Sequence, residues 1–190
     1  YIRQHKPIRI IYKSFKSKAA HEAVYHPYLL KEFRNRWFLI CGSCKGDQLF
    51  NLALDRMIQI EEADDTKFHP YDGIDFEQYY SDLIGVTKSK TDRAHKVILK
   101  VNPKNAPYII TKPLHSSQQI LSEDASGTTI RIDVILNFEL EKEILAFGNF
   151  IEVISPKLLK SRIHKRLKAA IDQYNPIPAN YTRQVPKRKV

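Results

Sequence analysis

The sequence lacks the features that mark membrane, secreted and low-complexity proteins. It has no stretch of about 18 uncharged apolar residues, and its N-terminus has no basic segment followed by an apolar one. Two cysteines cannot form a disulfide framework, which agrees with a reducing compartment. Only six glycines against 43% hydrophobic residues indicate a chain that folds around a core. We therefore expect a soluble, cytoplasmic protein with no membrane contact.

Motifs of catalysis and metal binding are missing as well. There is no Gly-rich phosphate loop, no GxSxG and no HExxH, and the seven histidines are scattered. Cys41 and Cys44 form a CxxC, but a structural zinc needs four ligands and no second cysteine pair exists. A redox CxxC usually opens a helix, whereas this one follows an apolar strand pattern. We expect no enzyme activity, no metal and no cofactor.

Positive charge is concentrated at the two ends of the chain. The net charge is +10, residues 1–60 hold 11 Lys and Arg against 4 Asp and Glu, and residues 155–190 hold 10 against 1. A basic surface attracts polyanions because binding releases their counterions. The charge therefore indicates either a nucleic-acid or phosphorylated ligand, or simply a solvated basic surface.

The first third of the chain predicts a small β domain over residues 1–62. Ile8, Ile10 and Tyr12 alternate with Arg9 and Lys13 in a half-buried strand over 7–15. The run "NRWFLICG" is a second strand, a turn at 43–47 follows, and 48–60 forms its hairpin partner. Short strands and turns without helical periodicity predict a twisted sheet closed into a barrel.

Residues 63–94 are acidic and predict a connector with a short helix between Phe76 and Leu83. The next segment, 95–175, follows the order β-α-β-β-α-β-α, which is typical of a ferredoxin-like α+β domain with an added helix. Its expected strands are 95–101, 118–123, 128–137 and 150–155, and its expected helices are 105–114, 138–147 and 156–174.

Several residues set the expected helix ends in this segment. Asn105 and Asn137 are expected helix caps and Gly148 a helix stop. In the last helix Leu159, Ile163, Leu167 and Ile171 are expected to share one apolar side. The Pro-rich basic tail, 176–190, is expected to be extended or disordered.

Several short motifs together resemble a known family. They are "IIYKSF" (10–15), "YHPYLL" (25–30), "RWFL" (36–39) and "LDRM" (54–57), followed by "NAPYII", "HSSQQI" and "ELEKEILAFGNFIEVISP". In this order they resemble the WYL-domain family of bacterial transcriptional regulators with its C-terminal extension, over about residues 5–175. The resemblance implies a mainly β, Sm-like or SH3-type barrel followed by a ferredoxin-like domain. Phe38 stands where the family signature has a tyrosine, so a hydroxyl is absent here.

The resemblance also implies a function. Such a chain is expected to be the effector-sensing module of a regulator, binding single-stranded nucleic acid or a nucleotide-like anion. It would act on operator DNA through an N-terminal winged helix-turn-helix, which does not precede Tyr1. We therefore expect the chain to be part of a longer or processed protein, and we expect that protein to be a homodimer. The alternative is a protein-interaction and dimerisation module without a small ligand.

Six residues are candidates for ligand contact. Arg36 and Arg56 can each offer a planar fork of donors to phosphate or carboxylate. The alternative for Arg36 is a solvated charge at a strand end, and the alternative for Arg56 is a salt bridge with Asp55 or another carboxylate. Trp37 can stack on a base or pack in the core. The remaining candidates contribute polar groups and are Tyr12, Ser14 and His26.

Overall fold

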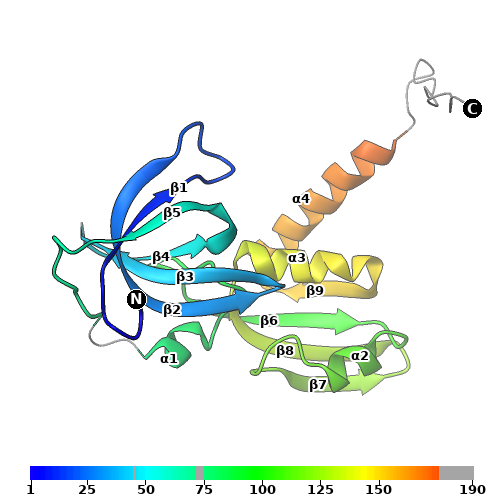
Figure 1. Ribbon diagram of the computed structural model, residues 1–190. Helices are drawn as coiled ribbons and strands as arrows, with labels where there is room; N and C mark the ends of the chain where they lie inside the picture. Colours follow the sequence, from blue (N-terminus) through cyan, green and yellow to red (C-terminus); the bar gives the residue numbers. More distant parts are fainter. Residues whose placement is uncertain (45, 72–74, 176–190) are drawn as a thin grey trace, which may run out of the picture.

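The chain folds into two antiparallel sheets that lie side by side (Figure 1). The computed structural model describes residues 1–44, 46–71 and 75–175, so the predicted tail at 176–190 and part of the acidic connector lie outside it. In those ranges no helix is long and apolar enough to cross a membrane.

The first sheet has the strand order β4-β3-β2-β1-β5. Its strands are β1 (Ile8–Tyr12), β2 (His21–Phe33), β3 (Arg36–Ser43), β4 (Gly46–Ala53) and β5 (Met57–Glu62). As the alternation predicts, Ile8, Ile10 and Tyr12 are buried and pack with Leu39 and Leu52 in a small core.

The sequence pattern does not predict β2, the longest strand of this sheet. It pairs with both β1 and β3, and its register against β3 shifts between Pro27 and Leu29. Such a bulge moves the following side chains to the other face of the sheet, so that the strand shows no continuous two-residue period. Proline within the segment further weakens the strand signal.

The predicted closure of this sheet into a barrel is not found. β4 and β5 are the two edge strands, and no pairing between them occurs among the described residues. The sequence pattern also predicts one strand over 48–60, whereas the 3₁₀ helix η1 (Leu54–Arg56) interrupts it. Because the chain turns at η1, β5 leaves the edge formed by β4 and joins β1 at the opposite edge.

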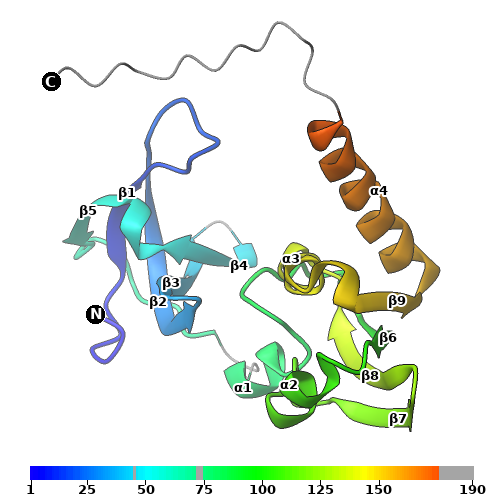
Figure 2. The same ribbon diagram turned by 90° about the vertical axis from the view of Figure 1, so that its right-hand side faces the viewer.

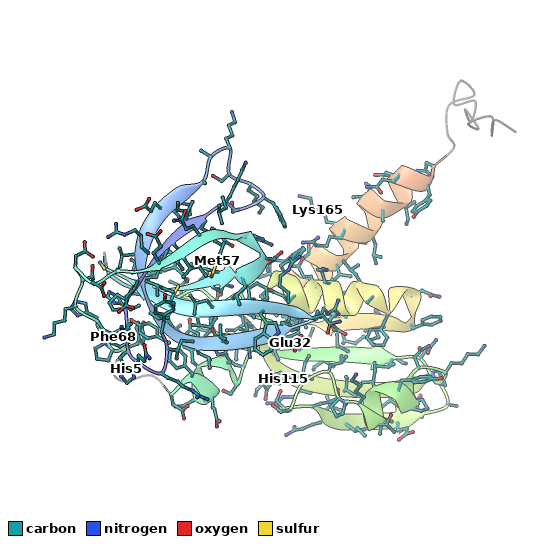
Figure 3. The ribbon with its side chains drawn as sticks, in the orientation of Figure 1. His5, Glu32, Met57, Phe68, His115 and Lys165 are labelled. Atoms are coloured by element: carbon teal, nitrogen blue, oxygen red, sulfur yellow. The ribbon has the colours of Figure 1, made fainter. Side chains whose placement is uncertain are left out.

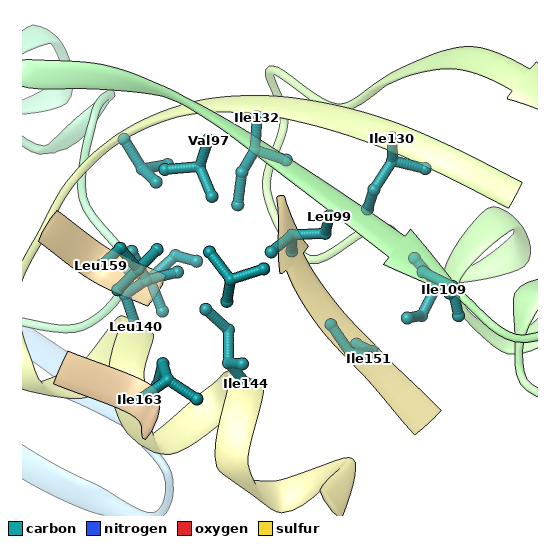
Figure 4. Close-up of a cluster of buried hydrophobic side chains, with 14 of the residues drawn as sticks. Val97, Leu99, Ile109, Ile130, Ile132, Leu140, Ile144, Ile151, Leu159 and Ile163 are labelled. Atoms are coloured by element: carbon teal, nitrogen blue, oxygen red, sulfur yellow. The ribbon is translucent and has the colours of Figure 1, made fainter. Parts of the chain in front are cut away.

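The second sheet has the order β7-β8-β6-β9 and follows the predicted β-α-β-β-α-β-α sequence of elements. Its elements are β6 (Ala94–Val101), α2 (Ala106–Thr111), β7 (Gln119–Asp124), β8 (Gly127–Ile135), α3 (Phe138–Ala146), η2 (Gly148–Phe150), β9 (Ile151–Ser155) and α4 (Lys157–Tyr174). Side chains from the helices and from one face of the sheet form one apolar cluster (Figure 4). Leu99, Ile130, Leu140 and Leu159 in this cluster are completely buried.

Two helix ends agree with the sequence and one does not. Asn137 caps α3, since its Oδ1 accepts a hydrogen bond from the Leu140 N–H at 2.8 Å, and Gly148 follows the helix with a φ of +57°. Asn105 makes no side-chain cap at α2. Instead the Oδ1 of Asn102 accepts from the Asn105 N–H at 3.0 Å.

The last helix leaves the body of the molecule. Leu159 and Ile163 are buried in the second core, but Leu167 and Ile171 are exposed, so the expected apolar side is covered only over the first half of α4. The distal half extends away from both sheets (Figures 1 and 2).

Burial in the second core predicts which side-chain truncations lower the stability of the protein. Leu99→Ala should lower the free energy of unfolding by about 2–5 kcal/mol, because Leu99 is fully buried and its removal leaves a cavity. Leu121→Ala on the exposed strand β7 is the matched control and should change it by less than about 0.5 kcal/mol. Urea unfolding followed by circular dichroism measures both, and equal losses would show that the cluster does not carry the stability assigned to it.

Candidate functional site

A hollow of about 650 Å³, the junction hollow, lies between the first sheet and α3. Five cationic residues and three phenylalanines contribute to its wall, together with a single acid among the described residues. The complete lining is Lys16, Phe33, Arg34, Asn35, Arg36, Phe38, Asn51, Arg56, Val86, Thr87, Phe138, Glu139 and Lys142.

The turn between β2 and β3 forms one side of the junction hollow. Arg34 and Asn35 have φ values of +51° and +61°, and two consecutive positive values give the turn type whose twist matches an antiparallel hairpin. Arginine adopts this conformation only at a cost in conformational energy. The turn brings Arg34 to α3, where its guanidinium pairs with Glu143. Figure 3 marks Glu32 near this hairpin tip, beside the second sheet.

Arg36 and Phe38 follow the turn and both line the junction hollow from β3. Alternate residues of a strand share a face, which explains why the arginine and the phenylalanine occur together there. Arg36 forms an ion pair with Asp55 at 3.5 Å, and both side chains are almost half exposed. An exposed pair of this kind contributes about 0–1 kcal/mol, so it leaves the Arg36 guanidinium free to bind an anion.

Arg56 reaches the same hollow from η1. Its guanidinium carbon lies 4.3 Å from the centre of the Phe15 ring, a cation–π arrangement. Its Nε is buried and has no hydrogen-bond partner among the described residues. The salt bridge with Asp55 considered from the sequence is therefore made by Arg36 instead.

The N-terminal part of α3 and the segment at Val86 and Thr87 form the other side of the junction hollow. Thr87 donates from its Oγ1 to Glu139 Oε1 at 2.6 Å, and Lys142 lies over the Phe138 ring at 5.7 Å. Oε2 of Glu139 is buried and lacks a hydrogen-bond partner in the described part of the chain. Sequence reasoning missed Arg34, Glu139 and Lys142, because only the packing of α3 against the hairpin brings them to Arg36.

The other candidates lie away from the junction hollow. Tyr12 is buried in the first core, where its hydroxyl accepts from the Ala53 N–H at 3.3 Å. Ser14 is half-buried in a turn, with its carbonyl accepting from the Ser17 N–H. Trp37 is 51% exposed, so the alternative that it packs in the core is wrong. It borders a separate surface hollow with Leu30 and Tyr80.

His26 is buried and contacts Cys44, Phe68 and His69. Its Nδ1 accepts from the His69 N–H at 3.4 Å and its Nε2 lies 3.3 Å from Cys44 Sγ. Phe68 packs edge-on against the same ring and lies beside His5 (Figure 3). Burial lowers the pKa of His26 below its ordinary value of 6.5, and the charge of His69 acts in the same direction.

A larger hollow of about 800 Å³ has a different character. It is lined by the N-terminal residues and by apolar side chains of the first sheet, among them Leu30, Leu39, Met57 and Ile60. Because this lining is mainly apolar, it does not suit an anion. Among the described residues no group of His, Cys, Asp or Glu is placed to hold a metal ion.

Comparison with known proteins assigns both halves of the chain. Residues 1–62 match the WYL domain and residues 93–171 match the WCX domain. A solved structure of a CRISPR Cas-related protein has a TM-score of 0.53 with 14% identity, over 92% of this chain and 49% of that one. Proteasome accessory factor B/C (PafBC) of Arthrobacter aurescens has a TM-score of 0.39 with 18% identity, over 99% and 28%.

The similarity to the CRISPR Cas-related protein concerns the fold alone. This chain spans about half or less of either protein. No curated protein matches the sequence.

The contacts of His26 predict a pH dependence of stability. Below pH 6.5 the unfolded chain takes up a proton at His26 that the folded chain does not take up. As the pH is lowered further, His26 should therefore decrease the free energy of unfolding by at most about 1.4 kcal/mol per pH unit. His26→Asn should reduce this slope, while the exposed His164→Asn should leave it as it is. Urea unfolding at several pH values measures the slope, and equal slopes for both variants would contradict the assignment.

Proposed function

This chain belongs to the WYL-domain family, and we propose that it is the effector-sensing module of a bacterial transcriptional regulator, with single-stranded nucleic acid or a nucleotide-like anion as effector. We further propose that it acts by binding, without catalysis, on a DNA-binding domain that belongs to the same regulator.

The observation that carries this proposal is the composition of the junction hollow. Lys16, Arg34, Arg36, Arg56 and Lys142 come from four segments of the chain, Arg34 and Arg36 from one hairpin, and line one concave surface together with three phenylalanine rings. Arginine forks match phosphate oxygens, and aromatic rings offer a surface on which bases stack. The combination suits a nucleotide better than it suits a simple inorganic anion.

The position of the hollow supports a role in regulation. Its cations come from both the first sheet and α3, so a bound effector would contact both domains. Binding shifts a conformational equilibrium only when the ligand prefers one of the two arrangements. We propose that the effector favours the arrangement in which α3 and the β2–β3 hairpin lie close together.

We also propose a specific architecture for each of the two sheets. The order β7-β8-β6-β9 with helices between β6 and β7 and between β8 and β9 supports a ferredoxin-like arrangement. The order β4-β3-β2-β1-β5, with η1 before β5, supports an Sm-like arrangement of the open first sheet.

A protein-interaction and dimerisation module is the second candidate. The apolar hollow of about 800 Å³ favours it, because exposed apolar surface commonly marks contacts between proteins. In that case the junction hollow would have no ligand.

Fluorescence anisotropy with labelled single-stranded oligonucleotides and nucleotides, at several salt concentrations, separates the two candidates. The unchanged protein should bind saturably and more weakly as salt rises, since bound phosphates release counterions. Arg36→Ala with Arg56→Ala should weaken binding by about tenfold or more, which corresponds to the loss of charge-assisted contacts.

Arg93→Ala with Lys165→Ala removes the same charge from exposed positions and serves as the control. Equal weakening in both double variants would show that general attraction, and not the junction hollow, holds the ligand. No binding by any nucleotide, together with concentration-dependent dimerisation, would favour the interaction module.

A further inference from the structure

We propose that the ligand of the junction hollow carries a guanine base and that Glu139 recognises the edge of this base. The inference rests on the proposed function, because it names the class of nucleotide that the same site would select. It starts from Glu139, the one acid among the described residues that line the hollow.

Glu139 is fixed from two sides. Thr87 donates to its Oε1 at 2.6 Å. The backbone of Gly85 lies against its stem so closely that a Cβ on Gly85 would be 2.5 Å from the Glu139 Cγ, and the φ of +97° at Gly85 is one that other residues rarely adopt. The stem of Glu139 is therefore held in place before any ligand arrives.

One oxygen of this carboxylate is left without a partner. Oε2 of Glu139 is buried and accepts no hydrogen bond among the described residues, although buried polar atoms nearly always have a partner. No ion pair joins Glu139 to a cation of the described chain, despite the five cations around the hollow. On the first-sheet side, Arg56 Nε is a buried donor in the same situation.

A molecule that offers N–H donors to Glu139 and oxygen acceptors to the arginines would satisfy both sides at once. The last torsion of a glutamate side chain is soft, so a small rotation turns Oε2 toward the hollow. Because the cations outnumber the acid, the part of the ligand that faces them is anionic. A nucleoside phosphate has both kinds of group at opposite ends.

Guanine fits the carboxylate better than the other bases do. Its N1–H and 2-amino group are two adjacent donors, which match the two oxygens of a carboxylate. Adenine and cytosine present one amino group beside a ring-nitrogen acceptor, and uracil presents one N–H between two carbonyl oxygens, so each places an acceptor against the carboxylate. Phe38 from β3 and Phe138 from α3 line the same hollow and provide apolar surface for the base.

Glu139 also lies in the first turn of α3, where a negative charge favours the helix dipole. That role accounts for an acid at this position. It gives no reason for a buried oxygen without a partner in a hollow lined by cations, whereas recognition of a base edge does.

The test is a competition experiment with GMP, IMP, XMP and AMP against a fluorescent guanine nucleotide, on the full chain and on Glu139→Gln. The unchanged protein should bind GMP about tenfold or more tightly than AMP, with IMP between them because it lacks the 2-amino group. Glu139→Gln should lose affinity for GMP and gain it for XMP, since the amide donates to the 2-carbonyl of xanthine and accepts from its N1–H.

The gain for XMP requires a folded variant, so misfolding cannot imitate it. Short single strands that differ only in one guanine or adenine show whether the guanine belongs to a free nucleotide or to a strand. Equal affinity for GMP and AMP, or an unchanged preference in Glu139→Gln, would overturn base recognition. If binding then still depends on Arg36 and Arg56, the proposed function stands without it, and if no nucleotide binds at all, both proposals fall.

Discussion

The contact between the β2–β3 turn and α3 is the constraint on which the candidate site depends. Arg34 pairs with Glu143 across it, and Asn51 Nδ2 donates to the Val86 carbonyl at 3.0 Å close by. Asn137 strengthens the same region, because its side chain caps α3 and also donates to the Ile84 carbonyl at 2.8 Å. These contacts determine the distance between the arginines of the first sheet and the first turn of α3.

The site combines weakly paired cations with a well-held acid. Among the described residues, Arg36 forms a half-exposed ion pair with Asp55 and Arg56 Nε has no partner, whereas Glu139 is held by Thr87 and Gly85. Like charges that gather around one hollow repel one another, so an anion would relieve a cost that the free protein bears. This distribution favours a ligand over a purely structural role for the hollow.

The sequence predicts local structure well and tertiary contacts poorly. The alternation around Ile10, the cap at Asn137 and the order of elements after residue 94 all follow from short-range patterns. The strand β2 was missed because its bulge interrupts the period, and the barrel remained open because η1 divides the segment predicted as one strand. Both features depend on where a strand finds its partner.

The same contrast between local patterns and tertiary contacts holds for the candidate site. Arg36 and Arg56 could be singled out by residue type and motif, but Trp37 is exposed and Tyr12 is buried in the core. Glu139 gave no signal of ligand contact, since an acid in a first helical turn is ordinary, and Lys142 reads as one of many charged residues on a helix. Only the approach of α3 to the hairpin gives them a place in the site.

Hydrogen–deuterium exchange of the whole chain, with and without saturating GMP or a short guanine-containing single strand, tests the central claim most directly. A ligand held in the junction hollow should slow exchange at the β2–β3 turn and at the first turn of α3 together. Protection restricted to the first sheet, or to the apolar hollow around Leu30 and Ile60, would contradict the claim that both domains bind one ligand.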